Sequence, residues 1–374
     1  MKRTTALPFY ARLAFVLVSI ICIGYLSLIG KEILSPLIFG FLFAILLFPL
    51  AGFLEYKLRF PRSVAALVSV ILFTIGILLV LYLIGTQIST LAGDFPLLKK
   101  QVADSIADLQ IWLQETFNLN ATKQMNYVHQ ATEKALSASG AVIGQTVLSL
   151  SSMMLFLVFL FIYTFFLIFH RRLLMKFLVS VFDEAHSTTV QEIATHIQYI
   201  IKKYIVGLFF QMLIVAALAC IVLSILGVKY GILLGVIIGV FNIIPYVGIF
   251  SALFLSCLIT FATAGASKAL IVAVAIFCVH LVDSNYIMPT IVGSKVKINA
   301  LITVLGVFLG EMLWGISGMF LSIPVIAIMK IVFDRVESLK PWGLLLGDEE
   351  HNEKRKKKKV LQDEQPVPKV KTEH

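Results

Sequence analysis

Long apolar stretches separated by short polar ones dominate the chain. A helix that rises 1.5 Å per residue needs about 20 apolar residues to cross a hydrocarbon core of about 30 Å. Stretches of this length, which we expect to be conventional membrane spans, are Leu13–Ile29, Ile33–Phe53, Val64–Ile84, Val147–Phe169 and Tyr204–Leu226. The pattern predicts an all-α polytopic membrane protein, with spans one to three in residues 1–85 and span four in residues 147–169.

Two polar segments interrupt this series. In residues 86–146, apolar positions recur at spacings of three and four between Leu98 and Leu113, and a second helix is expected around Met125–Leu136. We interpret this insert as a helical hairpin outside the membrane, with a dedicated binding domain as the alternative. In residues 170–203, an apolar stripe runs from Val190 to Ile201, which predicts an amphipathic link along the membrane surface before span five.

The last apolar region, residues 204–333, has a different pattern. Residues 230–263 carry no charge over 34 positions, yet their middle contains a break at Pro245, Tyr246 and Gly248. Two full spans and a turn need about 40 residues, so we expect a short helical hairpin whose arms need not cross the bilayer. Residues 269–288 form a further span that ends at Pro289. Residues 300–332 repeat the hairpin pattern, with breaks at Gly310, Gly315, Gly318 and Pro324, which gives about eight membrane segments in all.

Composition supports membrane embedding. Hydrophobic residues make up 59% of the chain and charged residues only 14%, whereas soluble domains carry about 25% charged residues. Much of the net charge of +10 lies in the basic run from Lys354 to Lys359, within a tail at 334–374 that we expect to be cytoplasmic and disordered. No basic face with interleaved aromatic residues appears, so membrane lipid is a better partner for this charge than nucleic acid.

The distribution of Lys and Arg predicts how the chain is oriented. Basic residues concentrate before span one, in the loop around Arg59, in the link after span four and in the tail, which places both termini in the cytoplasm and the insert outside. Each short hairpin then follows a span of opposite direction. Inverted units of this kind place transporter binding sites near the bilayer midplane, at the hairpin tips 242–248 and 310–318.

Few polar side chains lie inside the apolar segments, and these are the candidates for chemistry. Asp283 is the strongest, because an ionisable group in a membrane segment is costly and usually marks a pathway. His280 lies on the same helical face and Asn285 lies nearby, so the three could bind a cation, a proton or a polar solute. The alternative is that Asp283 sits near the interface and only orients Pro289.

Two other polar side chains lie at the hairpin breaks. Glu311 either contacts a solute or ion or faces cytoplasmic water, and Asn242 either satisfies backbone groups at the break or contacts the solute. The cysteines lie in apolar stretches without metal-ligand spacing, so no metal or cofactor is expected. Metalloprotease, nucleophile-elbow and phosphate-loop motifs are absent from the sequence, so neither an enzyme nor an ATP-driven pump is expected.

Several ordered motifs resemble those of the autoinducer-2 exporter family, also called PerM-like permeases. They are Phe241–Gly248, with the sequence FNIIPYVG, then Asp283–Pro289 followed by Gly293 and Lys295, and the glycines from Gly310 to Gly318 followed by Pro324. The similarity covers almost the whole chain. Departures from the family pattern are His280 in place of a Gln, Asp283 in place of a Glu, Ile249 and Ala300 in place of prolines, and Glu311 in place of a Gly.

The resemblance implies a secondary transporter or exporter of a small solute that forms homo-oligomers in the inner membrane of the cell. Within that family, some members are associated with export of autoinducer-2 and others with sodium/proton antiport, so Na⁺ or H⁺ are the expected coupling ions. A membrane scaffold or envelope-stress protein without transport is the alternative from another class.

Overall fold

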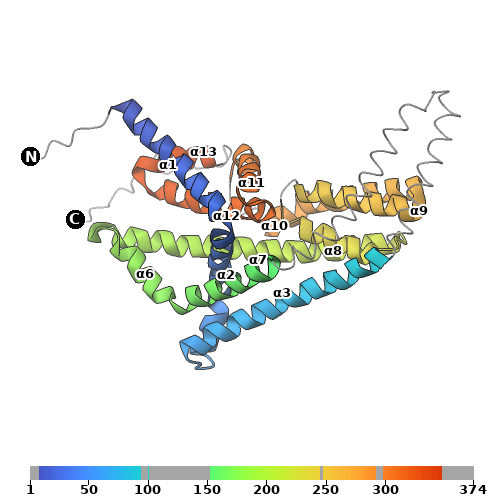
Figure 1. The fold of residues 1–374 in the computed structure, drawn as a ribbon, viewed down its shortest axis with the longest axis horizontal. Helices are drawn as coiled ribbons and strands as arrows, with labels where there is room; N and C mark the ends of the chain where they lie inside the picture. The colour runs from blue at the N-terminus through green and yellow to red at the C-terminus, as the bar shows by residue number, and fades with distance from the viewer. Residues whose placement is uncertain (1–7, 94–99, 101–151, 245–246, 292–297, 348–374) are drawn as a thin grey trace, which may run out of the picture. The chain divides into compact units, whose positions relative to one another are not determined.

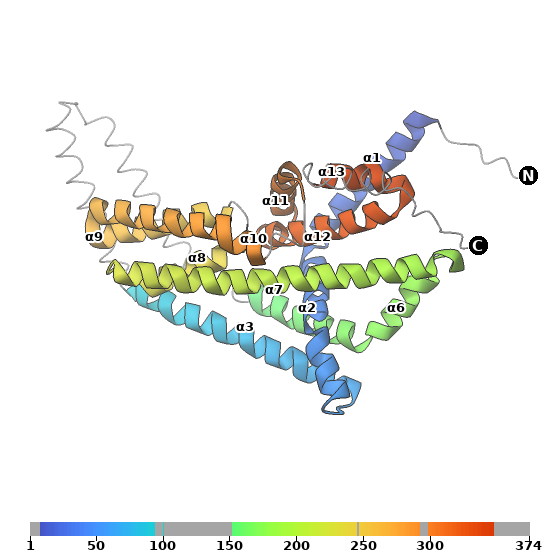
Figure 2. The ribbon, with the colours of Figure 1, turned by 180° about the vertical axis from the view of Figure 1, so that it is seen from behind.

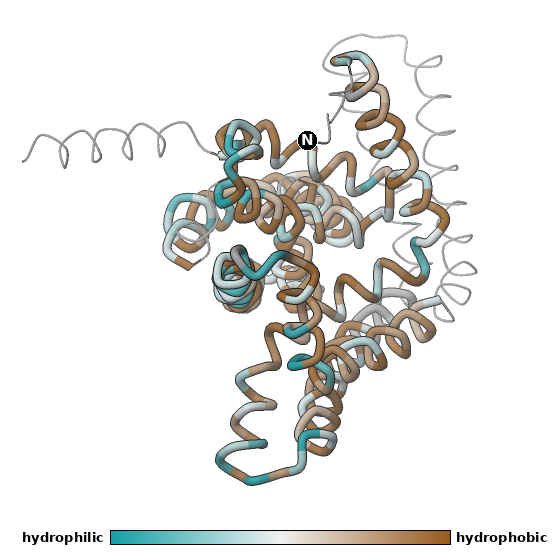
Figure 3. Tube along the Cα trace, turned by 90° about the vertical axis from the view of Figure 1, so that its left-hand side faces the viewer, coloured by the Kyte–Doolittle hydropathy of each residue, from teal (hydrophilic) through white to brown (hydrophobic). Residues whose placement is uncertain are grey.

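The computed structural model describes residues 8–93, 100, 152–244, 247–291 and 298–347 (Figure 1). Throughout these residues the regular structure is helical, apart from one isolated bridge between Ile298 and Gly347. Among them, seven helices are long and apolar enough to cross a membrane, and two more are apolar but shorter. Figure 3 shows hydrophobic residues running along most of the helical length. The protein is therefore an all-α polytopic membrane protein, as the sequence predicts.

The chain divides into two compact units. Unit 1 comprises residues 1–31, 172–204 and 293–374, and unit 2 comprises residues 32–171 and 205–292. The predicted site residues that lie before Gly293 belong to unit 2. Those from Gly310 to Pro324 belong to unit 1.

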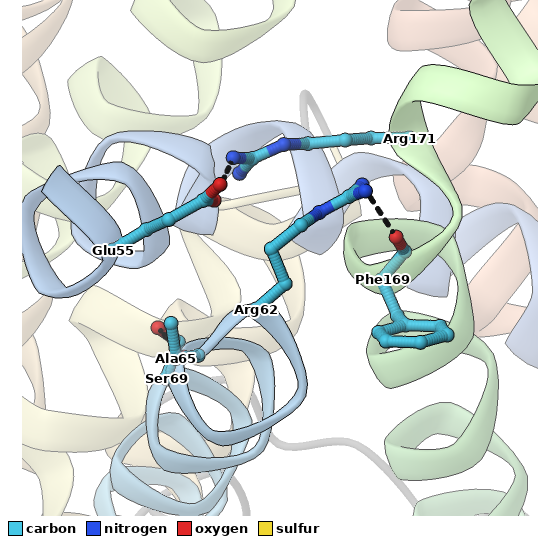
Figure 4. Close-up of polar contacts among 6 residues, drawn as sticks. All are labelled: Glu55, Arg62, Ala65, Ser69, Phe169 and Arg171. Carbon is cyan, nitrogen blue, oxygen red and sulfur yellow. Dashed lines mark hydrogen bonds and ion pairs between the residues drawn. The ribbon is translucent and has the colours of Figure 1, made fainter. Parts of the chain in front are cut away.

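The first half of unit 2 is built from α2 (Lys31–Tyr56), α3 (Arg62–Gly93) and the helix Ser152–Phe169. Their apolar faces form one core, whose buried members are Ala44, Leu47, Ala51, Ala66, Val70 and Ile168. At one end of this group, where α2 ends and α3 begins, Arg171 forms an ion pair with Glu55, and the guanidinium of Arg62 donates to the carbonyl oxygen of Phe169 at 2.8 Å (Figure 4). These contacts hold together the end of α2, the start of α3 and the end of the helix Ser152–Phe169.

The second half of unit 2 contains the end of α7 (Ser187–Ile225) together with α8 (Gly231–Phe241) and α9 (Val247–Val282). In α8, Gly235 and Gly239 lie so close to Cys220 and Ala216 of α7 that an added methyl group would come within 2.5 Å of them. Small residues every four positions therefore let these two helices approach closely. The apolar core here is formed by buried residues of all three helices, among them Leu223, Leu234 and Ile276.

The helix α9 contains two arms. Gly265, with φ of 82° and ψ of 177°, interrupts it, and this left-handed backbone is one that glycine adopts without strain. The first arm packs against α8 and forms the first hairpin (Figures 1 and 2). The second arm continues into a π-helical turn, Asp283–Ile287, and then into α10 (Met288–Ile291).

Unit 1 contains α1 (Phe9–Ile29), α11 (Ala300–Trp314), α12 (Ile316–Arg335) and α13 (Lys340–Leu346), with short 3₁₀ turns at Glu184–His186 and Glu337–Leu339. α11 and α12 pack along each other as a hairpin, and the indole of Trp314 donates to the carbonyl oxygen of Ser27 in α1 at 2.8 Å. The amphipathic α6 (Arg171–Ser180) begins at the last residue of unit 2 and continues into unit 1.

The break in this hairpin is narrower than the sequence suggests. Only Gly315 leaves the helical conformation, with φ of 62° and ψ of −138°. Gly310 and Gly318 stay inside α11 and α12, where a methyl group on either would come within 2.3 Å of the other's carbonyl oxygen. The buried Pro324 also lies inside α12. The glycines thus serve close helix contact on both sides of a single turn.

Two predicted boundaries differ from the structure. The second part of the amphipathic link, from Ser187 on, and span five form one continuous helix, α7, of 39 residues. The segment contains no proline, and the apolar stripe of the link continues in register through Ile201, Tyr204 and Leu208, which are buried. Near the C-terminus, the chain remains helical to Leu346, past the predicted start of a disordered tail at 334, because α13 packs on α12.

Other predictions fall mostly outside the described residues. α3 extends to Gly93, past the predicted boundary at residue 85. The remainder of the insert at 86–146, the first residues of the predicted span 147–169 and the basic run at 354–359 lie outside the described part of the chain.

Candidate functional site

The carboxylate of Asp283 lies inside unit 2, with only 3% of the residue exposed. The side-chain amide of Gln211 donates to both of its oxygens, at 3.0 Å to Oδ1 and 3.1 Å to Oδ2. The amide of Asn242 donates to Oδ2 at 2.9 Å. An acid in a membrane segment is thus held by three hydrogen bonds from two neutral amides.

Three elements bring these side chains together. Gln211, which is 5% exposed, comes from the middle of α7, Asn242 ends α8, and Asp283 opens the π-helical turn after α9. The tight contact of Gly248 with the carbonyl oxygen of Phe241 closes the α8–α9 turn beside Asn242. Single π-helical turns occur frequently at functional sites, because the extra residue turns a side chain away from its regular position.

His280 lies one turn before Asp283 on the same helix and is half-buried. Its Nε2 lies 3.3 Å from the hydroxyl of Ser284, while its Nδ1 is buried without a hydrogen-bond partner in the described structure. Buried polar atoms are nearly always hydrogen-bonded. His280 therefore has a free bonding position one turn from the acid.

The other predicted site residues are dispersed. Asn285 is exposed, and its amide donates to the backbone oxygen of Leu281 at 2.8 Å rather than to the carboxylate of Asp283. Glu311 belongs to unit 1 and is exposed near the α11–α12 turn. Pro289 lies exposed in α10. Pro245 and Tyr246 lie outside the described residues.

Gln211 is the residue that the sequence interpretation missed. It stands in a nearly uncharged stretch of α7, where it is the polar side chain between Lys203 and Ser224. A buried amide in a membrane helix needs a partner, so its isolation is the signal that points to an acid elsewhere.

The arrangement can bind a cation or a proton. The amides of Gln211 and Asn242 each carry a carbonyl oxygen, so rotation of either side chain would present oxygen ligands next to the carboxylate. Hard cations prefer such oxygen ligands. Groups of three or more His, Cys, Asp or Glu side chains with metal-binding geometry do not occur among the described residues.

Comparison with known proteins identifies the chain's family. The family model described as AI-2E family transporter matches residues 13–338. The chain belongs to the AI-2E transporter family.

Named relatives of this AI-2E protein cover different shares of its length. It is 22% identical to the AI-2 transport protein TqsA of Escherichia coli over 85% of this chain and 90% of that protein. It is 25% identical to the "Putative transport protein YueF" of Bacillus subtilis over 80% of this chain and 84% of that protein. A shorter match to YrrI of Bacillus subtilis is 33% identical over 34% of this chain and 36% of that protein.

Membership establishes a multi-pass transporter. Since the match extends through α1 to α12, the hydrogen-bonded acid and both hairpins lie within the part of the chain that the AI-2E family shares.

Proposed function

We propose that this AI-2E protein is a secondary transporter that exports a small solute across the inner membrane and couples its movement to Na⁺ or H⁺ at Asp283. The observation that supports the proposal most directly is the buried carboxylate with its two amide donors. Because a charge inside a membrane segment is costly unless it is paired or hydrated, an acid whose partners among the described residues are neutral amides is suited to take up a cation reversibly.

Cation binding and release at this site would change its hydrogen bonds. Gln211 and Asn242 donate to the carboxylate in the structure, and we assign this arrangement to the cation-free state. A bound Na⁺ or proton needs oxygen ligands or an acceptor instead, so the amides must turn. Asn242 ends α8 and Gln211 lies in α7, so the turn would bias the packing of α8 against α7. Differential binding of this kind is what shifts a conformational equilibrium.

The solute class follows from the AI-2E family. The printed name of TqsA, a relative that covers most of this chain, is AI-2 transport protein, so autoinducer-2 is the first solute to test. The hairpins α8–α9 and α11–α12 would be the moving elements. We further propose cytoplasmic termini, and assembly as a homo-oligomer.

Reconstitution into liposomes tests the proposal. With autoinducer-2 inside and an imposed Na⁺ or H⁺ gradient, the wild-type protein should accelerate the release of the solute, and collapse of the gradient should abolish this acceleration. Asp283→Asn should lose coupling by about tenfold or more, because the neutral amide cannot bind the cation. Asp283→Glu is the matched control that keeps the charge.

Two results would redirect the assignment. Proton movement driven by Na⁺ without any solute would indicate a sodium/proton antiporter that uses the same acid. Absence of both activities in well-folded, reconstituted protein would favour a membrane scaffold. Unchanged coupled transport in Asp283→Asn would show that the carboxylate has no coupling role.

A further inference from the structure

We propose that α6 lies in the membrane–water interface and binds anionic phospholipid headgroups. The inference does not depend on the transported solute or on Asp283. It concerns the ten residues Arg171–Ser180 and the two apolar residues that follow, Val181 and Phe182.

The helix is amphipathic and has no buried residue. Four of its apolar side chains and that of the following Val181 are exposed: Leu173 61%, Leu174 42%, Phe177 63%, Leu178 40% and Val181 59%. At 100° per residue these positions fall within an arc of about 140°. An apolar face of this size, which no described residue covers, needs an apolar environment.

The opposite face carries two basic residues, which lie beside the half-buried Met175 and Val179. Arg172 and Lys176 lie one helical turn apart and point away from the apolar arc, and Arg171 at the start of the helix pairs with Glu55. Asp183 and Glu184 follow beyond the end of the helix, so they do not interrupt this face. Basic residues opposite Leu and Phe are the pattern of helices that lie flat in the headgroup region.

The position of α6 in the chain places it directly after a membrane span. The helix Ser152–Phe169, which is long and apolar enough to span, ends one residue before α6, and the Arg171–Glu55 and Arg62–Phe169 contacts fix that end (Figure 4). α6 therefore begins at the membrane–water interface, where this span ends. Anionic headgroups complement Lys176 and Arg172 there, while the acyl chains take up Leu173, Phe177 and Val181.

Spin-label accessibility of the full-length protein in nanodiscs tests the placement. Each variant carries one nitroxide-labelled cysteine, at Arg172, Leu173, Lys176, Phe177 or Val181, with the native cysteines changed to alanine. Val16, in the middle of α1, gives the lipid reference, and Glu337, in an exposed 3₁₀ turn, gives the water reference.

For each label we compare the rate of nitroxide collisions with oxygen to the rate of collisions with a water-soluble nickel complex. We expect the ratio of these rates to vary along α6 with a period of 3.6 residues. Labels at 173, 177 and 181 should give a ratio several-fold above those at 172 and 176 and close to that of Val16. Water-like ratios at all five positions would overturn the proposal. Spin–spin coupling between labels at Phe177 would also overturn it, by showing that a second copy covers the face.

A lipid-retention experiment tests the headgroup preference. Native mass spectrometry would compare retained phosphatidylglycerol and phosphatidylcholine. Arg172→Gln with Lys176→Gln should lower phosphatidylglycerol retention by about half or more, while Lys176→Arg keeps it. Equal retention of phosphatidylglycerol by the glutamine variant and by the wild type, with unchanged thermal unfolding, would refute the anionic preference.

Discussion

A buried carboxylate is stabilised here without any cation in contact with it among the described residues. Gln211 supplies two of its three hydrogen bonds and Asn242 supplies the third. A hydrogen bond to a charged group contributes about 1.5–3 kcal/mol, and a buried charge left without one costs more. The free energy of folding in this region therefore depends on the Gln211 amide as much as on the acid.

Replacement of Gln211 should expose this dependence. We expect Gln211→Leu to destabilise the protein by about 1–3 kcal/mol, because Asp283 keeps a single donor, that of Asn242. The measurement is thermal unfolding of the purified protein in detergent. The double variant with Asp283→Asn should recover part of the loss, since the unpaired charge is then gone. Equal unfolding temperatures for the Gln211→Leu variant and the wild type would contradict the role given to Gln211.

Some residues of the candidate site could be predicted from the sequence and others could not. Asp283 could be predicted because a charge in an apolar segment is visible without any partner. Asn242 was a candidate at the first hairpin break, but its bond to Asp283 and that of Gln211 could not be predicted. The two donors lie 41 and 72 positions away, and only the packing of α7 and α8 brings them to the acid. Asn285 was favoured by its nearness in sequence, yet it bonds its own helix.

At the scale of elements, the two hairpins depend on backbone contacts that only glycine permits. An added Cβ at Gly248 would lie 1.8 Å from the carbonyl oxygen of Phe241, and the Gly310–Gly318 pair is equally tight. The clash is with backbone atoms, which cannot rotate out of the way as a flexible side chain can. Each hairpin therefore has a turn region that tolerates no side chain.

Gly248→Ala should open the first hairpin. We expect a destabilisation of about 1–3 kcal/mol or more, because the α8–α9 turn must shift to relieve the overlap. Gly76→Ala in α3 is the control, since nothing lies within 4 Å of its added methyl group. Thermal unfolding of both variants separates local crowding from a general effect of alanine. A Gly248 variant as stable as the Gly76 variant would show that the turn adapts freely.

Element boundaries were the least predictable part of the fold. Hydropathy locates the apolar segments, but it divides α7 at Lys202 and Lys203 although the helix continues through both. Basic side chains can extend away from an apolar helix without breaking it. At the second hairpin, the glycine pattern marks the break correctly at Gly315, while Gly310 and Gly318 serve packing instead.

For the whole molecule, the distribution of basic residues predicts the sidedness of the chain. Membrane-impermeant thiol labelling of intact cells should modify Asn120→Cys, in the insert. Gln362→Cys, in the tail, should be modified only after the membrane is opened. Both variants need the native cysteines changed to alanine. Labelling of Gln362→Cys in intact cells would reverse the proposed orientation of both termini.

One helix joins the two units. α7 passes from unit 1 to unit 2 between Tyr204 and Ile205 without a break, and its 39 residues correspond to a rod about 58 Å long. A rod of this length acts as a lever: a tilt of about 10° moves one end by about 10 Å relative to the other. Gln211 lies 24 residues after Ser187, where α7 begins (211 − 187), which is about 36 Å along this lever, so a tilt of about 10° around Gln211 would move that end by about 6 Å.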